Sequence, residues 1–261
     1  MRIVSAHNFY RSDAPSGENL VVERERRLLT AAGHGVIAVD RHSDDLLKSR
    51  WVQLRCAAEL GPRVRRRRSL HQALAPLRRD HTILHVHNLW PLFTYDLLVV
   101  AKELDFVVVQ TLHNYRQIAT DTHLIERAGP RKPRDSAEAL HLRRMPAMHG
   151  GRLRNALYTR ALGAWCRDPA WPDCVDRWLC LTEFQRRCFL AAGWPAARLS
   201  VKPNFVPDLE RLPVSMDAGD YVLFVGRLKA EKGIDRLVRL WPRTGLPLRV
   251  VGDGPLRDRL P

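Results

Sequence analysis

The sequence lacks the features that mark membrane-spanning, disulfide-stabilised and zinc-stabilised proteins. It has no run of about 18 apolar residues, so we expect no transmembrane helix. Its first residues pass straight into a strand-like segment without the order of a secretory signal, which predicts a cytoplasmic location. Its five cysteines are odd in number, and no two stand in a Cys-x2-4-Cys pair. We therefore expect reduced, mostly buried thiols rather than a disulfide framework or a structural zinc site.

Two nucleotide-binding fingerprints are missing as well. The sequence contains neither the dinucleotide pattern G-x-G-x-x-G nor the P-loop pattern G-x-x-x-x-G-K-[ST]. Both patterns use glycine and the start of a helix to hold phosphate groups. Their absence argues against a nicotinamide-dependent oxidoreductase and against a P-loop NTPase.

Lysine is scarce, although the net charge is +15: only six of the 43 basic residues are lysine. This bias favours arginine enrichment at the codon level over a nucleic-acid surface, and no helix-turn-helix or RNA-binding motif is present, so we expect no nucleic acid partner. The densest basic run is 63–68. We interpret it as a solvated helix or loop; the alternative is a surface for anionic lipid headgroups or a phosphorylated acceptor.

What the sequence does contain is an alternation of short apolar runs and amphipathic stretches. This alternation predicts an α/β fold with a parallel sheet and right-handed crossovers. The expected strands are 2–7, 36–40, 82–87, 106–112, 177–181, 199–202, 221–225 and 247–251. The expected helices are 18–32, 42–60, 64–77, 95–104, 155–166, 182–192 and 233–240, with a long active-site loop at 114–150.

The length of 261 residues is enough for roughly two domains. We predict an N-terminal Rossmann-like domain at 1–203, a proline-punctuated linker at 204–219 and the first part of a second Rossmann-like domain at 220–261. In the first predicted helix, the apolar face is Val21, Val22, Leu28, Leu29 and Ala32. Trp165, Trp171 and Trp178 are interpreted as core or interface residues.

Three loops that follow predicted strands carry candidate site residues, because ligands of open parallel sheets collect at the carboxyl ends of the strands. Gly17 opens a helix, where free amides attract anions, although an ordinary turn would look the same. His113 follows a strand and could transfer a proton, bind or merely hydrogen-bond at a domain edge. Gly226 allows close backbone approach, Arg227 offers a planar guanidinium and Lys232 a point charge, which favours a diphosphate clamp over a basic surface turn.

His85 and His87 share one face of a predicted strand, so a metal pair with His113 as the third ligand is conceivable. Histidines at strand ends are more commonly hydrogen-bonded, and we predict no metal site.

Together these segments resemble the family-4 retaining glycosyltransferases. The donor-side match is Gly226-Arg227-Leu228-x-x-Glu231-Lys232-Gly233-Ile234-Asp235 and Val250-Val251-Gly252-Asp253-Gly254-Pro255-Leu256. The acceptor-side match is His7-Asn8-Phe9-Tyr10, Ser16-Gly17-Glu18-Asn19, His85-Val86-His87-Asn88 and Thr111-Leu112-His113-Asn114-Tyr115-Arg116. Val201-Lys202-Pro203-Asn204-Phe205-Val206 resembles the crossover between the two domains.

The resemblance implies a GT-B fold that binds a nucleotide sugar between two Rossmann domains and transfers the sugar with retention, without a cofactor or metal ion. It implies that Arg227 and Lys232, with Gly226, hold the donor diphosphate, that Gly17 approaches the phosphate from the other domain, and that His113 is the catalytic group beside the transferred sugar. Further sugar contacts are expected from Glu18, Asn114, Tyr115 and Arg116. The implied acceptor is a sugar or a lipid-linked sugar in cell-surface polysaccharide or glycoconjugate synthesis, with possible peripheral contact with an anionic membrane.

The sequence departs from the family in two places. Ser16 stands where a glycine often precedes Gly17, and the family's Glu-x7-Glu pair falls beyond the point where this chain stops. We therefore expect a C-terminally truncated enzyme with little or no transferase activity, whose strands at 221–225 and 247–251 are under-covered and prone to self-association. The alternative is a non-catalytic module that binds an acceptor or a partner.

Overall fold

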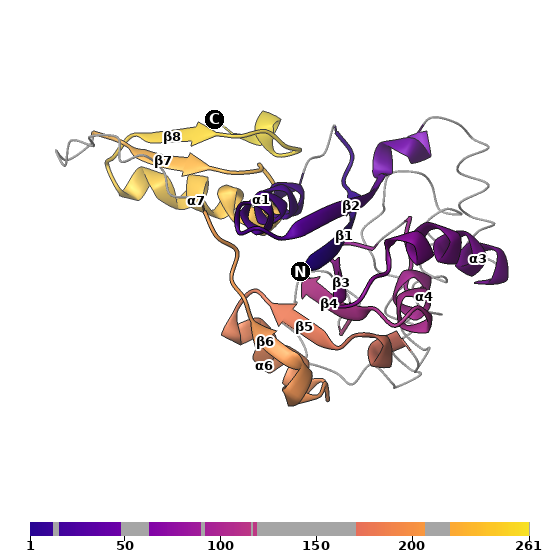
Figure 1. Cartoon of the computed structure of the whole chain (residues 1–261). Helices are drawn as coiled ribbons and strands as arrows, with labels where there is room; N and C mark the ends of the chain where they lie inside the picture. Colours follow the sequence, from indigo (N-terminus) through magenta and orange to yellow (C-terminus); the bar gives the residue numbers. More distant parts are fainter. Residues whose placement is uncertain are drawn as a thin grey trace. The chain divides into compact units, whose positions relative to one another are not determined.

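In the computed structural model the chain divides into two compact units, Met1–Pro207 and Asp208–Pro261 (Figure 1). The structure describes residues 1–12, 16–47, 63–89, 92–115, 117–118, 171–206 and 220–260. The predicted helix at 155–166 lies outside these residues, as do most of the predicted linker at 204–219 and most of the predicted loop at 114–150.

A six-stranded parallel sheet forms the centre of the first unit, as the alternation of apolar runs predicts. Its strands are β1 (Arg2–Phe9), β2 (Gly35–His42), β3 (Thr82–Val86), β4 (Val107–Leu112), β5 (Arg177–Cys180) and β6 (Leu199–Val201). They lie in the order β2-β1-β3-β4-β5-β6, and every neighbouring pair is parallel. All six carboxyl ends therefore meet at one edge of the sheet, where side chains that follow β1, β3 and β4 can converge.

The helices of the first unit form mainly where apolar periodicity predicts them. Among the described residues they are α1 (Gly17–Ala31), α3 (Arg63–Leu74), α4 (Asp96–Glu103) and α6 (Glu183–Ala191), with short 3-10 turns at Ser43–Leu47, Ala75–Leu77, Trp171–Cys174 and Ala196–Arg198. Of the helix predicted at 42–60, the described residues form only the last residue of β2, His42, and the 3-10 turn. The spacing of Thr182 and Gln185 is typical of a capping box at a helix start, and helix α6 begins there: Thr182 accepts a hydrogen bond from the amide of Gln185 at 3.0 Å.

The arginine-rich run lies in α3, in agreement with the helical interpretation. Its residue Arg67 is not merely solvated, because its guanidinium lies 3.1 Å from the carboxylate of Asp96 and 3.5 Å from that of Glu103, both in α4. The run therefore contributes at least one ion pair that ties α3 to α4.

The predicted apolar face of the first helix is wrong at two positions, Leu28 and Ala32, which are both exposed. Leu28 is 53% exposed, whereas the two buried residues of the helix are Val22 and Glu25. Burying a carboxylate is costly unless it is paired. Glu25 is paired: its carboxylate lies 2.8 Å from the ammonium group of Lys202, which is far from it in sequence.

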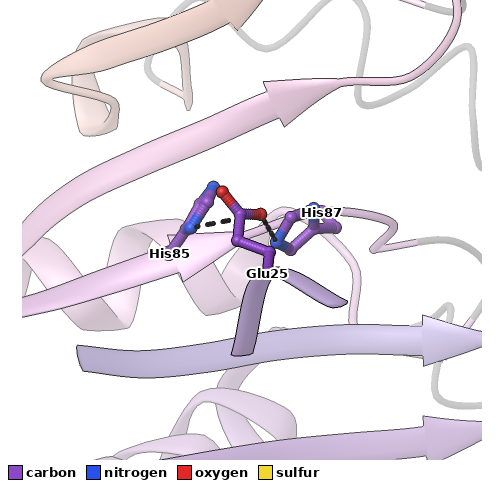
Figure 2. Close-up of side chains that lie close together, drawn as sticks. All are labelled: Glu25, His85 and His87. Atoms are coloured by element: carbon purple, nitrogen blue, oxygen red, sulfur yellow. Dashed lines mark ion pairs between the residues drawn. The ribbon is translucent and has the colours of Figure 1, made fainter. Parts of the chain in front are cut away.

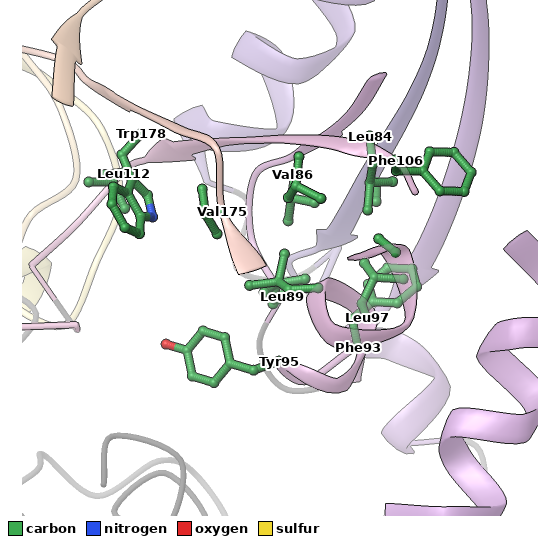
Figure 3. Close-up of a cluster of buried hydrophobic side chains, with 14 of the residues drawn as sticks. Leu84, Val86, Leu89, Phe93, Tyr95, Leu97, Phe106, Leu112, Val175 and Trp178 are labelled. Carbon is green, nitrogen blue, oxygen red and sulfur yellow. The ribbon is translucent and has the colours of Figure 1, made fainter. Parts of the chain in front are cut away.

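The core lies between the sheet and the helices beside β3 and β4 (Figure 3). Leu84 and Val86 of β3 contribute fully buried side chains, as do Leu97 of α4 and Trp178 of β5. Of the three tryptophans predicted as core or interface residues, Trp178 is in the core, and Trp165 lies outside the described residues. Cys180 and Cys188 are free and buried, and Cys174 is free and partly buried.

The second unit contains a short parallel pair, β7 (Val222–Val225) and β8 (Leu248–Val251), with helix α7 (Ile234–Leu240) between them. Turns of 3-10 helix lie at Ala230–Lys232, Trp241–Arg243 and Arg257–Arg259. The apolar residues Leu223, Val225 and Val251 are 51 to 69% exposed, so these strands are under-covered as expected. None of the described helices has both the length and the apolarity that a membrane span requires.

Candidate functional site

The carboxyl end of β4 places His113 at the edge of the six-stranded sheet. Thr111 and Leu112 are buried, and the side chain of His113, one residue later, is half-buried. The side-chain amide of Gln185, itself buried, donates a hydrogen bond to the carbonyl of Leu112 at 2.9 Å. Helix α6 therefore fixes the backbone that presents His113. The sequence marks Gln185 only as a cap residue, because its long-range acceptor lies 73 positions away.

The end of β3 brings two more histidines to the same place. Nδ1 of His87 lies 3.0 Å from Nε2 of His113, and their rings are stacked with centroids 5.3 Å apart. Nε2 of His85 lies 2.8 Å from the hydroxyl oxygen of Thr111. The parallel pair β3 and β4 thus brings together the three histidines that the sequence indicates. One hydrogen bond joins the rings of His87 and His113, and another joins His85 to the hydroxyl of Thr111.

Glu25 approaches these histidines from α1 (Figure 2). Its Oε2 lies 3.3 Å from Nε2 of His87 and 4.0 Å from Nδ1 of His85, and its Oε1 lies 2.8 Å from Nζ of Lys202. Neither histidine contact has hydrogen-bond geometry, and Oε2 has no hydrogen-bond partner among the described residues. The sequence did not predict Glu25 as a site residue, because no sequence pattern around it distinguishes it from the other charged residues of α1.

His7 connects the end of β1 to the loop that carries Gly17. Its Nε2 lies 3.1 Å from Oδ1 of Asn19, and its Nδ1 accepts a 3.4 Å hydrogen bond from the amide of Asn88. The ring therefore carries its proton on Nε2 in the neutral form. Gly17 is the first residue of α1, and a Cβ built on it would meet no described atom within 4 Å. The space beside Gly17 is thus open to a ligand.

Side-chain contacts of Glu18 and Arg26 hold α1 in place. Glu18 accepts a hydrogen bond from the hydroxyl of Tyr10 at 3.1 Å. Arg26 bonds both oxygens of Asp40 at 2.8 and 2.6 Å, as well as the hydroxyl of Ser5 at 2.9 Å. Such bidentate pairs fix geometry well. The glycine loop therefore rests on a helix that is anchored to both β1 and β2.

Burial sets the protonation of the histidine group. Burial lowers the pKa of His7 to about 4 and that of His113 to about 3, and it lowers the pKa of His85 as well. The pKa of His87 is held well below its usual range by burial and by the neighbouring His85 and His113. All four rings are therefore neutral near pH 7, where each can both donate and accept a hydrogen bond.

The remaining predicted sugar contacts lie just beyond His113. Asn114 and Tyr115 are half-buried, and Arg116 lies outside the described residues. The ring of Tyr115 stacks on Phe189 with centroids 6.4 Å apart, and burial raises the pKa of its hydroxyl. Tyr115 therefore packs with part of its ring against the core.

In the second unit, the loops after β7 and β8 run side by side. The amide of Leu228 donates to the carbonyl of Asp253 at 2.8 Å, and the amide of Leu256 donates back to Leu228 at 3.0 Å. A Cβ at Gly252 would overlap the carbonyl oxygen of Gly226, and one at Gly254 would lie 2.6 Å from that of Leu228. Only glycine fits at these two positions, where φ is +156° and +153°.

This loop pair presents the predicted diphosphate clamp. Arg227 and Lys232 are both exposed. Lys232 ends a 3-10 turn, and Gly233 then takes a left-handed conformation with φ of +71° before α7 begins. The two cationic side chains are thus carried by one β7–α7 connection at the carboxyl end of β7, and Gly226 opens that connection.

Comparisons of the whole chain with known proteins yield structural similarity only. No protein-family model matches the sequence, and no curated protein matches it. Among solved structures, the lipopolysaccharide outer core galactosyltransferase WaaB in its apo form is similar at 14% identity, with a TM-score of 0.52 over 99% of this chain and 63% of that chain. HepE of Anabaena in complex with UDP-glucose gives 15% identity and a TM-score of 0.46 over 97% of this chain and 61% of that one. MurG of Acinetobacter baumannii gives 10% identity and a TM-score of 0.44 over 97% of this chain and 58% of that one.

Of these three, WaaB superposes closely enough to support a fold assignment. The six-stranded parallel sheet with its helices, followed by the β7–α7–β8 unit, defines a GT-B type of fold: one complete Rossmann-like unit and the first part of a second. The chain spans less than two thirds of the length of each of these structures.

Proposed function

We propose that the protein is a glycosyltransferase that moves a sugar from a nucleotide-sugar donor to an acceptor, in the synthesis of a cell-surface polysaccharide or glycoconjugate. The observation that carries the proposal is the arrangement at the carboxyl edge of the six-stranded sheet. There a half-buried neutral histidine, His113, is held by a buried network, in a fold of the GT-B type. A fold alone does not define a reaction, so the site residues carry the argument.

His113 is suited to hydrogen-bond a sugar at the reacting centre. Its Nε2 is engaged with His87, which leaves Nδ1 and the exposed part of the ring for a ligand as far as the described residues are concerned. A neutral imidazole can accept a proton from a sugar hydroxyl or donate to it, depending on the tautomer. In a retaining transfer without a metal ion, this contact would position the sugar while the glycosidic bond to the diphosphate breaks.

The departing nucleoside diphosphate is an anion, so cations placed beside it stabilise the transition state. Arg227 and Lys232 would supply that charge, with Gly226 allowing close approach of the backbone. Gly17 would meet the phosphate from the first unit, where the space for a Cβ is open. WaaB is described as a galactosyltransferase and HepE as a complex with UDP-glucose, which supports a UDP-sugar as the first donor to test.

Titration of the full chain with UDP-, GDP- and ADP-sugars by calorimetry tests the proposal. We expect saturable binding of one nucleotide sugar, weakened at least about tenfold in Arg227→Ala, which removes a charge-assisted contact of at least about 1.4 kcal/mol. Arg243→Ala, another exposed arginine of the second unit, is the matched control and should bind normally. Binding that survives Arg227→Ala would overturn the clamp. Binding without any transfer to acceptors would favour the alternative, a non-catalytic acceptor- or partner-binding module.

A further inference from the structure

Glu25, His85 and His87 form a buried group with the composition of a metal site (Figure 2). One oxygen of Glu25, one nitrogen of His85 and one nitrogen of His87 all lie within 4.8 Å of one another. All three residues are at most 6% exposed. Imidazole nitrogen and carboxylate oxygen are ligands that Zn²⁺ and related divalent ions accept together.

The unpartnered oxygen of Glu25 points to a missing ligand. Oε1 is satisfied by Lys202, but Oε2 faces the two histidines and has no hydrogen-bond partner in the part of the chain that the structure describes. A buried carboxylate oxygen left without a partner is costly. A cation bound between Oε2 and the two imidazoles would remove that penalty.

The outer contacts of both histidines fit the same interpretation. Nε2 of His85 is engaged with Thr111, and Nδ1 of His87 with His113. When each of these nitrogens carries the proton and donates outward, the inner nitrogens, Nδ1 of His85 and Nε2 of His87, present lone pairs to Glu25. Metal-bound histidines typically have this arrangement, in which the second ring nitrogen donates to an outer acceptor.

The distances allow the three atoms to share one ion. Ligands at about 2.0 Å from a tetrahedral Zn²⁺ lie about 3.3 Å apart. The contact from Glu25 to His87 is already 3.3 Å, that to His85 is 4.0 Å, and all three ligand atoms lie within 4.8 Å of one another, so side-chain shifts of at most about 1.5 Å complete the set. We propose that Glu25, His85 and His87 bind one divalent transition-metal ion of the Zn²⁺ type, with a fourth position left for water.

Lys202 sets the affinity of this site. Its ammonium group lies 2.8 Å from the same carboxylate and therefore repels a second cation, although its side chain is 34% exposed and can turn toward solvent. The ion would tie α1 to β3 and act on His113 only through His87. This role differs from the proposed transfer chemistry and does not rest on it.

The test uses the full chain, freed of metal by a chelator and titrated with Zn²⁺ by calorimetry and with Co²⁺ by visible absorption. We expect one ion per chain, with the intense visible bands of a tetrahedral Co²⁺ site. His85→Ala, His87→Ala and Glu25→Gln should each weaken binding at least about 100-fold, because each removes a ligand. His71→Ala, an exposed histidine of α3, is the matched control and should leave binding unchanged. Lys202→Met should strengthen binding several-fold.

Two results would overturn the proposal. One is the absence of saturable binding to the unaltered chain; the other is binding that persists in the three ligand variants. A cobalt–thiolate charge-transfer band would place the ion on cysteine and would also contradict it. If the ligand variants fail to fold, Co²⁺ added to the unaltered chain decides: the imidazole signals of His85 and His87 must broaden in the NMR spectrum before that of His71.

Discussion

The two parallel sheets of this chain are built from similar apolar strands but are buried to different extents. In the six-stranded sheet, Val4, Leu84 and Val108 are fully buried. In the two-stranded sheet, Leu223 is 51% and Val225 69% exposed. Parallel strands are normally covered on both faces. The first unit therefore carries its site on strands with fully buried side chains, whereas the second presents its basic loop on strands that are half exposed.

One matched substitution compares the two sheets most directly. Leu84→Ala should lower the free energy of unfolding by about 2–5 kcal/mol, because it opens a cavity in a close-packed core. Leu223→Ala should change it by less than about 1 kcal/mol, since half of that side chain is already in water. Urea unfolding followed by circular dichroism measures both. Equal losses in the two variants would show that the second sheet is covered in solution.

The pH dependence of stability sharpens the comparison, since the group of buried neutral histidines lies in the first unit. The pKa of His7 is about 4 in the folded chain, against about 6.5 when unfolded. Between these values the unfolded state binds the additional proton, so the stability falls as the pH is lowered from about 6.5 to 4, by about 1.4 kcal/mol per pH unit for this group, and levels off below. Above about pH 6.5 His7 is neutral in both states, so the protein no longer loses stability through its protonation.

Urea midpoints measured from pH 4 to 7 test this expectation, with His7→Gln as the variant. Glutamine can keep a hydrogen bond to Asn19 without titrating, so the slope against pH should become shallower. A slope that stays the same in the variant would remove His7 from the explanation.

The smallest change in stability is expected at Gly17. A Cβ there would meet no described atom within 4 Å, so Gly17→Ala should change the free energy of unfolding by no more than about 1 kcal/mol. If a phosphate group occupies that space, the same variant should weaken nucleotide-sugar binding at least about tenfold, which calorimetry measures. A variant that is stable and binds normally would exclude Gly17 from the donor site.

Much of the fold could be predicted because its signals are local. Short apolar runs mark all eight strands, and Thr182 with Gln185 marks the start of α6. The position of His113 at a strand end follows from the same pattern. Of the helix predicted at 42–60, the described residues form the last residue of β2, His42, and the 3-10 turn that follows it, so the predicted start of that helix is wrong.

The supporting network of the site could not be predicted because its contacts are distant in sequence. In the sequence, Glu25 resembles an ordinary exposed residue of an amphipathic helix. Its partner Lys202 follows directly after β6, the last strand of the six-stranded sheet in chain order. Likewise, nothing near Gln185 indicates that its amide reaches Leu112. The local sequence pattern predicts helices and strands. Whether a charged residue such as Glu25 is buried depends on which helices and strands pack together in the fold.

The central proposal is that His113, at the carboxyl edge of the six-stranded sheet, contacts the sugar of the nucleotide-sugar donor. The most direct test follows the imidazole signals of His113 by NMR, assigned with His113→Gln, during titration with the nucleotide sugar that binds and, separately, with its nucleoside diphosphate alone. The account predicts that the His113 signals move with the nucleotide sugar and much less with the diphosphate. A nucleotide sugar that binds in an Arg227-dependent way and leaves His113 unchanged would contradict it.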